Sequence, residues 1–516
     1  MKREPIMKKT LSLLLCLLLC LPALPVLGED AALPPFELPF SAPENDSAPT
    51  RTSDIKLYLP NEDSSALVTV DTVVVLRPFK WYAEPVLEAL FSWRPISGQP
   101  TKARSLPGAS YLALNTMNPV EISDGIATVN LAASAMNLSH EDLYTVWMAI
   151  TDTLCQFGDI RGVNLLISGI QPGIDVASQT PAGTALRQSD DLATLWARAE
   201  SRRSSAASGK RITCDVTLYF PAFDGRGILC ETRTLVFAST TPPQMAKVLL
   251  SALSEGPEDI HVPALPDLNT LLNAVFISED SGERVLSLRF DDALDTALSD
   301  SGISRACFCA SLAYTMTTFL PGIAGLDVWI GDSQVTSVTP EATYQGAGEA
   351  IAFADGIMRR SQFAIFLLSQ CTLYFSDGSG MLKATERAIP WYETRSPRFL
   401  LEQLILGSMH YDSVKALKSV IPSSVSGGDI LAVALPARGN CLLVSLTPGF
   451  LAACKGMAPD MEKAMVYAMV NTLTELETVN EVCFFAGAEQ ADTFAGSIVM
   501  RGTFLRNVNM INKLPE

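Results

Sequence analysis

The chain has 516 residues, of which 48% are apolar and 18% are charged, and its formal net charge is −17 at pH 7. This composition excludes an intrinsically disordered chain, and the length exceeds what one hydrophobic core normally organises. The acidic balance disfavours nucleic acid as a partner, because the long-range field of the protein repels polyanions.

The first 28 residues have the pattern of an export signal. Lys8 and Lys9 precede an apolar run over residues 11–21. This run is shorter than the roughly 20 apolar residues that span a bilayer. Small residues close the segment, so we expect a cleaved signal over 1–28, with cleavage after Gly28. We therefore expect the mature protein to be exported from the cytoplasm.

Two other interpretations of this segment remain open. An uncleaved apolar run would act as a membrane anchor. A lipoprotein is less favoured, because Leu15 and Leu19 precede the two cysteines of the run at positions where a small residue is needed. The proline-rich residues 29–53 then predict an extended tether, which would keep the protein close to the membrane.

Beyond the tether, one pattern recurs three times. Each copy opens with a predicted strand that carries a tyrosine: Tyr58, Tyr219 and Tyr374. Each copy places a threonine on a later predicted helix: Thr153, Thr315 and Thr472. The tyrosine-to-threonine separations are 95, 96 and 98 residues. So constant a spacing predicts tandem copies of one domain. We place these domains at 54–189, 211–361 and 362–516. The residues at 190–210 are expected to form a linker that begins with a short amphipathic stretch, Leu192, Leu195 and Trp196.

Within each copy the elements follow one order. Two strands are predicted at 55–59 and 72–76, 216–220 and 233–237, and 371–375 and 386–389. A helix then begins near a proline (Pro85, Pro243 and Pro397), where the missing N–H costs nothing. A hairpin with a glycine turn leads into a second helix, at 140–157, 304–319 and 460–477, and a last strand, at 163–168, 326–330 and 482–486. The order β-β-α-β-β-α-β predicts an α+β fold, with two helices packed on a mainly antiparallel sheet in each domain.

The third copy carries motifs that resemble a known family. These are the helix sequence at 471–476, the strand ending in glycine at 482–487 and the tail at 502–507. Together with the tyrosine strand they resemble the GerMN domain of exported sporulation and spore-germination proteins, and the resemblance extends to all three copies. This chain departs from the family's acidic residue before the glycine of the last strand, where it has Ser168, Ile330 and Ala486.

The sequence offers no constellation of catalytic or metal-binding residues. Its three histidines fall at unrelated positions of the copies: His140, His261 and His410. Cys307 and Cys309 form one close pair, but zinc needs more ligands. We therefore predict no catalytic, cofactor or metal site. The nine cysteines that follow the signal are expected mainly in cores.

Four sets of residues have a structural and a functional interpretation. Asp291 and Asp292 favour a helix start over acid–base chemistry. The recurring tyrosines favour the core over a shared groove, and the threonines favour close helix–sheet packing. The arginines of the glycine-to-arginine tails are the most plausible surface contacts, but solvated charges or salt bridges within a domain are favoured over that role: Arg187, Arg359 or Arg360, and Arg506.

From these observations we expect an exported, non-enzymatic protein that makes protein–protein or envelope contacts. By resemblance it would serve sporulation or spore germination, with other envelope or sporulation proteins as partners. It would then lie in the cell envelope or in the intermembrane space of the forespore. The alternative is a module that binds a cell-wall fragment or another small ligand. An enzyme is the third possibility, and the oligomeric state is left open.

Overall fold

The computed structural model describes residues 40–96, 101–174, 179–187, 190–258, 262–341, 343–344, 346, 348–414 and 416–512. The predicted export signal, most of the predicted tether and His261 lie outside the described residues. Within the described ranges, no helix combines the length and the apolar character that crossing a membrane requires. Residues 42–516 belong to one compact unit.

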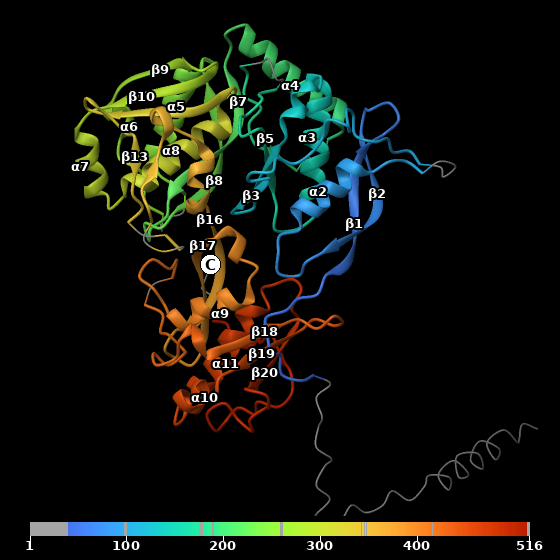
Figure 1. Ribbon diagram of the computed structural model, residues 1–516, viewed down its shortest axis with the longest axis vertical. Helices are drawn as coiled ribbons and strands as arrows, with labels where there is room; N and C mark the ends of the chain where they lie inside the picture. Colours follow the sequence, from blue (N-terminus) through green and yellow to red (C-terminus); the bar gives the residue numbers. More distant parts are fainter. Residues whose placement is uncertain are drawn as a thin grey trace, which may run out of the picture. The chain divides into compact units, whose positions relative to one another are not determined.

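The first repeat consists of an antiparallel hairpin, a helix, a four-stranded sheet and a second helix (Figure 1). Its elements are β1 (Arg51–Pro60), β2 (Leu67–Leu76), α2 (Ala83–Ser92), β3 (Val120–Ser123), β4 (Ile126–Leu131), α3 (His140–Leu154), β5 (Gly162–Ile167) and β6 (Ala185–Leu186). The sheet order is β3-β4-β5-β6, and its central pair β4–β5 is parallel. A parallel pair requires a crossover connection, which α3 supplies.

The second repeat follows the same plan with additional short elements. It contains β7 (Ile212–Pro221), β8 (Ile228–Phe237), α5 (Pro242–Glu255), α6 (Leu268–Leu271), β9 (Leu272–Asp280), β10 (Glu283–Phe290), α7 (Ala293–Asp300), α8 (Arg305–Phe319), β11 (Ile323–Ile330), β12 (Ser333–Gln334), β13 (Ser337–Val338), β14 (Ile351–Ala352) and β15 (Ile357–Met358). Its sheet has the order β12-β11-β10-β9, with β15 also paired to β11 and a parallel pair β10–β11.

The third repeat returns to the simpler plan. Its elements are β16 (Leu368–Ser376), β17 (Leu382–Pro390), α9 (Pro397–Leu406), β18 (Ile430–Ala434), β19 (Cys441–Leu446), α10 (Pro448–Cys454), α11 (Pro459–Leu473), β20 (Glu481–Ala486) and β21 (Phe504–Leu505). The sheet order β18-β19-β20-β21 repeats that of the first copy, again with a parallel central pair.

The predicted α+β class and element order are therefore confirmed. One detail differs from expectation, because the first two strands of each copy form a separate two-stranded sheet. The predicted glycine turn is found at Asp124-Gly125, where both residues have positive φ angles of 43° and 79°. Positive φ at both central residues suits the twist of a tight hairpin.

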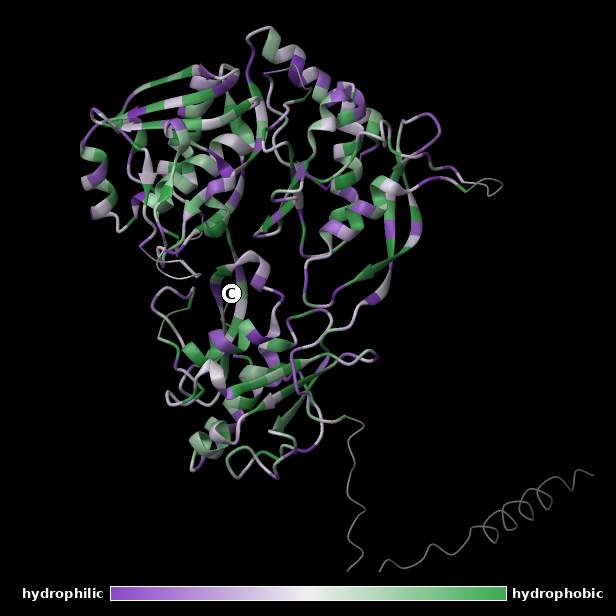
Figure 2. Cartoon of the chain, viewed as in Figure 1, coloured by the Kyte–Doolittle hydropathy of each residue, from purple (hydrophilic) through white to green (hydrophobic). Residues whose placement is uncertain are grey.

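Each repeat buries its own hydrophobic cluster between helices and strands. In the first repeat this cluster includes Leu57 of β1, Leu87 of α2, Val146 of α3 and Leu165 of β5, all fully buried. Hydrophobic and hydrophilic segments alternate along the elements (Figure 2). This alternation is what one buried face and one outer face require.

The predicted linker at 190–210 proved to be largely helical. Helix α4 (Leu192–Ala207) begins after Asp191, whose side chain accepts a hydrogen bond from the backbone N–H of Thr194 at 2.7 Å. Leu192 and Leu195 are buried in the core of the first repeat. The amphipathic stretch seen in the sequence therefore belongs to a helix that packs on the first repeat.

The described end of the predicted tether is docked on the third repeat. Ser47 donates its N–H to the carbonyl of Val433 at 3.1 Å, and Leu435 donates to the carbonyl of Ser47 at 2.8 Å. Asp46 forms an ion pair with Arg398 of α9. The chain just before the first repeat thus lies along β18 of the third repeat.

Candidate functional site

The nearly constant spacing between tyrosine and threonine in the three repeats has a simple structural cause. Thr153 accepts a hydrogen bond from the backbone N–H of Tyr58 at 3.1 Å, and Thr315 accepts one from Tyr219 at 3.0 Å. Each bond fixes the second helix on the first strand, as the packing interpretation predicted. In the third repeat, however, the buried hydroxyl of Thr472 has no hydrogen-bond partner among the described residues.

Strand register identifies the equivalent arginines of the three tails. The last strand pairs with its short neighbour as Val163 with Ala185, Leu326 with Met358, and Val482 with Phe504. The residue two positions beyond the short-strand partner is an arginine in every case: Arg187, Arg360 and Arg506. Arg360 is therefore the counterpart of the other two, and Arg359 is not.

Each tail arginine meets the tyrosine of its own repeat. Arg187 donates to the Tyr58 hydroxyl at 3.5 Å, and the Arg360 guanidinium lies 5.5 Å from the centre of the Tyr219 ring. In the third repeat, Arg506 contacts the Tyr374 hydroxyl and forms an ion pair with Glu475. The tyrosine, threonine and arginine thus form a recurring set that ties the tail to the first strand and the second helix.

The arginine of the second repeat differs from the other two by being buried. Arg360 forms an ion pair with Glu121 of β3 at 2.8 Å, and both side chains are at most 7% exposed. Glu121 also accepts a hydrogen bond from the Tyr314 hydroxyl at 2.9 Å. Burial alone would lower the pKa of Arg360, but the Glu121 carboxylate and two tyrosines raise it overall. Arg360 thus forms a salt bridge, but a buried one between two repeats, and it is neither a surface contact nor a solvated charge.

Glu121 itself was missed in the sequence. The available signal was a single acidic residue inside the apolar strand Val-Glu-Ile, since an unpaired carboxylate is rarely buried. Its partner could not be identified in this way, because Arg360 lies 239 positions further along the chain.

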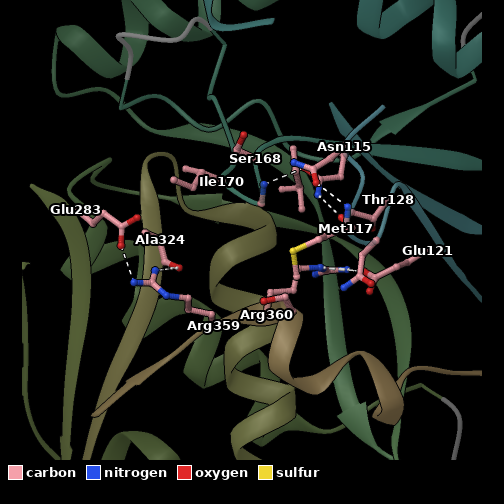
Figure 3. Close-up of a pocket in the computed structure, with 15 residues that line it drawn as sticks. Asn115, Met117, Glu121, Thr128, Ser168, Ile170, Glu283, Ala324, Arg359 and Arg360 are labelled. Atoms are coloured by element: carbon pink, nitrogen blue, oxygen red, sulfur yellow. Dashed lines mark hydrogen bonds and ion pairs between the residues drawn. The ribbon is translucent and has the colours of Figure 1, made fainter. Parts of the chain in front are cut away.

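A cavity of about 400 Å³ opens beside this ion pair. Figure 3 shows Arg359 with Glu283 on one side and Arg360 with Glu121 on the other. The lining of the cavity comes from the first and second repeats: Asn115, Met117, Asn118, Glu121, Thr128, Asn130, Leu166, Ser168, Gly169, Ile170, Glu283, Ala324, Arg359, Arg360 and Ser361. The carboxylates of Glu121 and Glu283 are each paired with an arginine, so neither is placed to act as a general acid or base. The other polar groups of the lining suit an uncharged polar ligand.

The other residues considered in the sequence are not brought together in this cavity. The nine described cysteines are all buried thiols, as expected for core residues, and burial raises the pKa of Cys307 to about 12. Among the described residues, no group of three or more His, Cys, Asp or Glu side chains could hold a metal ion. Asp291 accepts a hydrogen bond from the Ala293 N–H at 3.0 Å and so marks the start of α7.

Comparison with protein families gives a match for one part of the chain. Residues 372–490 match a family described as "Germane: Sporulation and spore germination". The chain contains a Germane domain. The family resemblance seen in the sequence is thereby confirmed, and the Germane match covers the Tyr374 strand, α11 and β20 of the third repeat. No curated protein matches this chain.

Solved structures give the following similarities to this Germane-domain chain. The tandem GerMN domains of the sporulation protein GerM from Bacillus subtilis align with 20% identity and a TM-score of 0.22, over 60% of this chain and 99% of that one. The first GerMN domain of the same protein aligns with 26% identity and a TM-score of 0.21, over 27% and 99%. A putative lipoprotein from Clostridium perfringens aligns with 15% identity and a TM-score of 0.19, over 27% and 87%.

Proposed function

We propose that this chain is an exported, non-enzymatic protein that makes protein–protein or envelope contacts during sporulation or spore germination. The observation that carries the proposal is the Germane domain at residues 372–490, whose family belongs to these two processes. The signal-like pattern of residues 1–28 supports export.

The use of the recurring polar residues supports a role in contacts rather than in catalysis. Thr153 and Thr315 each hold a helix on a strand through a hydrogen bond, and Arg360 forms an ion pair with Glu121. A catalytic group needs a free nucleophile beside a base, or an acid placed at a reacting atom. The residues that the three copies share instead hold the elements of each copy together, and Arg360 also joins the second copy to the first.

The experiment that tests this proposal follows a tagged chain through sporulation in its native host. We expect the full chain to reach the envelope or the forespore boundary, and a version lacking residues 1–28 to stay in the cytoplasm. A strain without the protein should sporulate or germinate poorly. A full chain that stays in the cytoplasm would refute export, and normal spore formation and germination without the protein would refute the biological role.

A second candidate function is binding of a soluble cell-wall fragment in the cavity beside Arg360. In the lining of this cavity two arginines pair with two glutamates and the other polar groups are uncharged, so the cavity favours such a ligand over an ion. Replacing Ile170 on the lining by Trp should reduce the affinity for an uncharged oligomer of N-acetylglucosamine by about tenfold or more, because the larger ring occupies the cavity. The same change at Ile96, which is 64% exposed and does not line this cavity, is the matched control. Titration calorimetry that finds no heat with the unmodified protein would dismiss this candidate.

A further inference from the structure

The first two repeats meet where a hairpin of the second repeat packs on the sheet of the first. The outer face of the β7–β8 hairpin lies against the open face of the first repeat's sheet. Thr217 of β7 receives a hydrogen bond from the side chain of Asn164 at 3.1 Å and lies 2.8 Å from the hydroxyl of Thr184. The Tyr219 hydroxyl lies 3.5 Å from that of Thr128. Thr217 and Tyr219 are each 1% exposed as a result.

The corresponding faces of the first repeat's hairpin and of the second repeat's sheet are exposed in the described part of the chain. On the outer face of the β1–β2 hairpin, Val73 and Val75 are 60% and 57% exposed. On the outer face of the second repeat's sheet, Phe276 is 40% exposed, and Arg289 lies 4.5 Å from the ring centre of the half-buried Trp329. Within the part of the chain that the structure describes, these faces of the first repeat's hairpin and of the second repeat's sheet are thus both exposed.

Register gives the equivalent positions on the two sheets. In the first repeat the third pair of the parallel strands joins Thr128 to Asn164, two residues after Gly162. In the second repeat the corresponding pair joins Ser287 to Asp327, two residues after Gly325. Asp327 therefore occupies the position from which Asn164 contacts the docked hairpin.

Register also gives the equivalent positions on the two hairpins. Tyr58 and Tyr219 correspond, because each donates its N–H to the helix threonine of its own repeat. The residue two positions earlier is Thr217 in the second repeat and Lys56 in the first. The hydrogen-bonded pair Thr217–Asn164 inside the chain thus corresponds to the potential pair Lys56–Asp327.

These two residues are complementary in charge and able to meet a partner. The Lys56 side chain is 57% exposed, and its contact with Asp71 is a solvent-exposed ion pair at 3.6 Å. Asp327 is half-buried and accepts hydrogen bonds from three neutral donors, on Ser287, Trp329 and Gln334. These neutral donors orient the carboxylate but do not cancel its negative charge. A lysine ammonium would therefore be attracted to Asp327.

The sheet of the third repeat does not offer the same surface. Its corresponding pair is Leu443 and Cys483, which are apolar and only 7% and 0% exposed. Among the described sheets, the second repeat is therefore the one whose face is both open and charged at the required position.

We propose that the β1–β2 hairpin of one copy docks on the β9–β11 face of a second copy, in the manner in which β7–β8 docks on the first repeat. The occupant is a second copy of this chain, chosen by the Lys56–Asp327 complementarity. Because the two surfaces are different, the contact can repeat head-to-tail to give rings or filaments, or it can form twice across a two-fold axis. This self-association does not depend on the proposed role in sporulation.

Charge reversal tests the proposal. Sedimentation velocity of the chain from residue 29 onward should show association that grows between about 1 µM and 1 mM and weakens with added salt. K56D and D327K should each weaken this association about tenfold or more, because each places like charges together. An equimolar mixture of the two variants, and the K56D/D327K double variant, should associate again.

Matched controls separate the contact from a general charge effect. K247D and D300K carry the same charge changes at exposed positions of α5 and α7 and should associate like the unmodified chain. D327N places at this position the residue that the first repeat uses, and it should fold and weaken association less than D327K. A chain that stays monomeric throughout this range, a folded double variant that does not recover, or controls that also abolish association would each overturn the proposal.

Discussion

The second and third repeats use the same tail arginine in opposite ways. Arg506 stays within its own repeat, where it pairs with Glu475, and both side chains are about one third exposed. Arg360 occupies the equivalent position and reaches Glu121 of another repeat, with both side chains buried. The difference shows that the neighbour of a repeat, rather than the shared motif, decides whether its arginine fastens one domain or joins two.

Removing the two arginines should therefore have very different effects. R360M leaves the buried Glu121 carboxylate without its counter-charge and should lower the free energy of unfolding by about 3–5 kcal/mol. R506M removes a partly exposed pair and should cost about 1 kcal/mol or less. Urea unfolding of both variants measures the difference. The E121Q/R360M variant is the control, and it should recover part of the loss because no buried charge then remains. Equal effects of R360M and R506M would contradict the comparison.

The helix threonines give a second contrast between the same repeats. T315V removes the acceptor of the Tyr219 N–H and leaves this buried group unpaired, which should cost about 1–3 kcal/mol. T472V replaces a buried hydroxyl that has no hydrogen-bond partner in the described chain, and it should be neutral or slightly stabilising. Thermal unfolding of the two variants side by side is the measurement. A T472V loss as large as that of T315V would show that Thr472 does bind a group of the protein or a water molecule.

A smaller effect is expected where the first repeat meets the third. Asp124 accepts hydrogen bonds from the N–H of Gln370 at 2.8 Å and from the hydroxyl of Ser369 at 3.4 Å. Burial raises the pKa of Asp124 to about 6, although the nearby Arg161 lowers it. Between about pH 4 and pH 6 the folded chain therefore holds a proton that the unfolded chain has released, and stability falls as the pH rises.

The D124N variant tests this pH dependence. Asparagine tolerates the positive φ of this turn position and keeps an acceptor oxygen for Gln370. It should be about 1 kcal/mol more stable than the unmodified chain at pH 7, and the advantage should disappear near pH 4. Denaturant midpoints across this range are compared with those of D300N, an exposed control. An advantage that does not change with pH would mean that the charge of Asp124 is not its cause.

The sequence by itself determined the repeating part of this protein. The tyrosine–threonine spacing, the glycine turns and the apolar periods predicted three copies, their element order and the α+β class. These features depend on contacts within one copy, where a strand and its helix must meet at a fixed separation. The resemblance of residues 471–476 and their neighbours to GerMN domains likewise used motifs that the match to residues 372–490 then confirmed.

Only the tertiary structure decided how the copies meet. Neither the burial of Glu121 against Arg360 nor the packing of Thr217 on Asn164 follows from a local pattern, because the partners belong to different repeats. The helix at Leu192–Ala207 was likewise ambiguous, since a short amphipathic stretch does not say whether a core is available to receive it. Pairing across repeats depends on which face each copy presents, and a period along the chain carries no information about that choice.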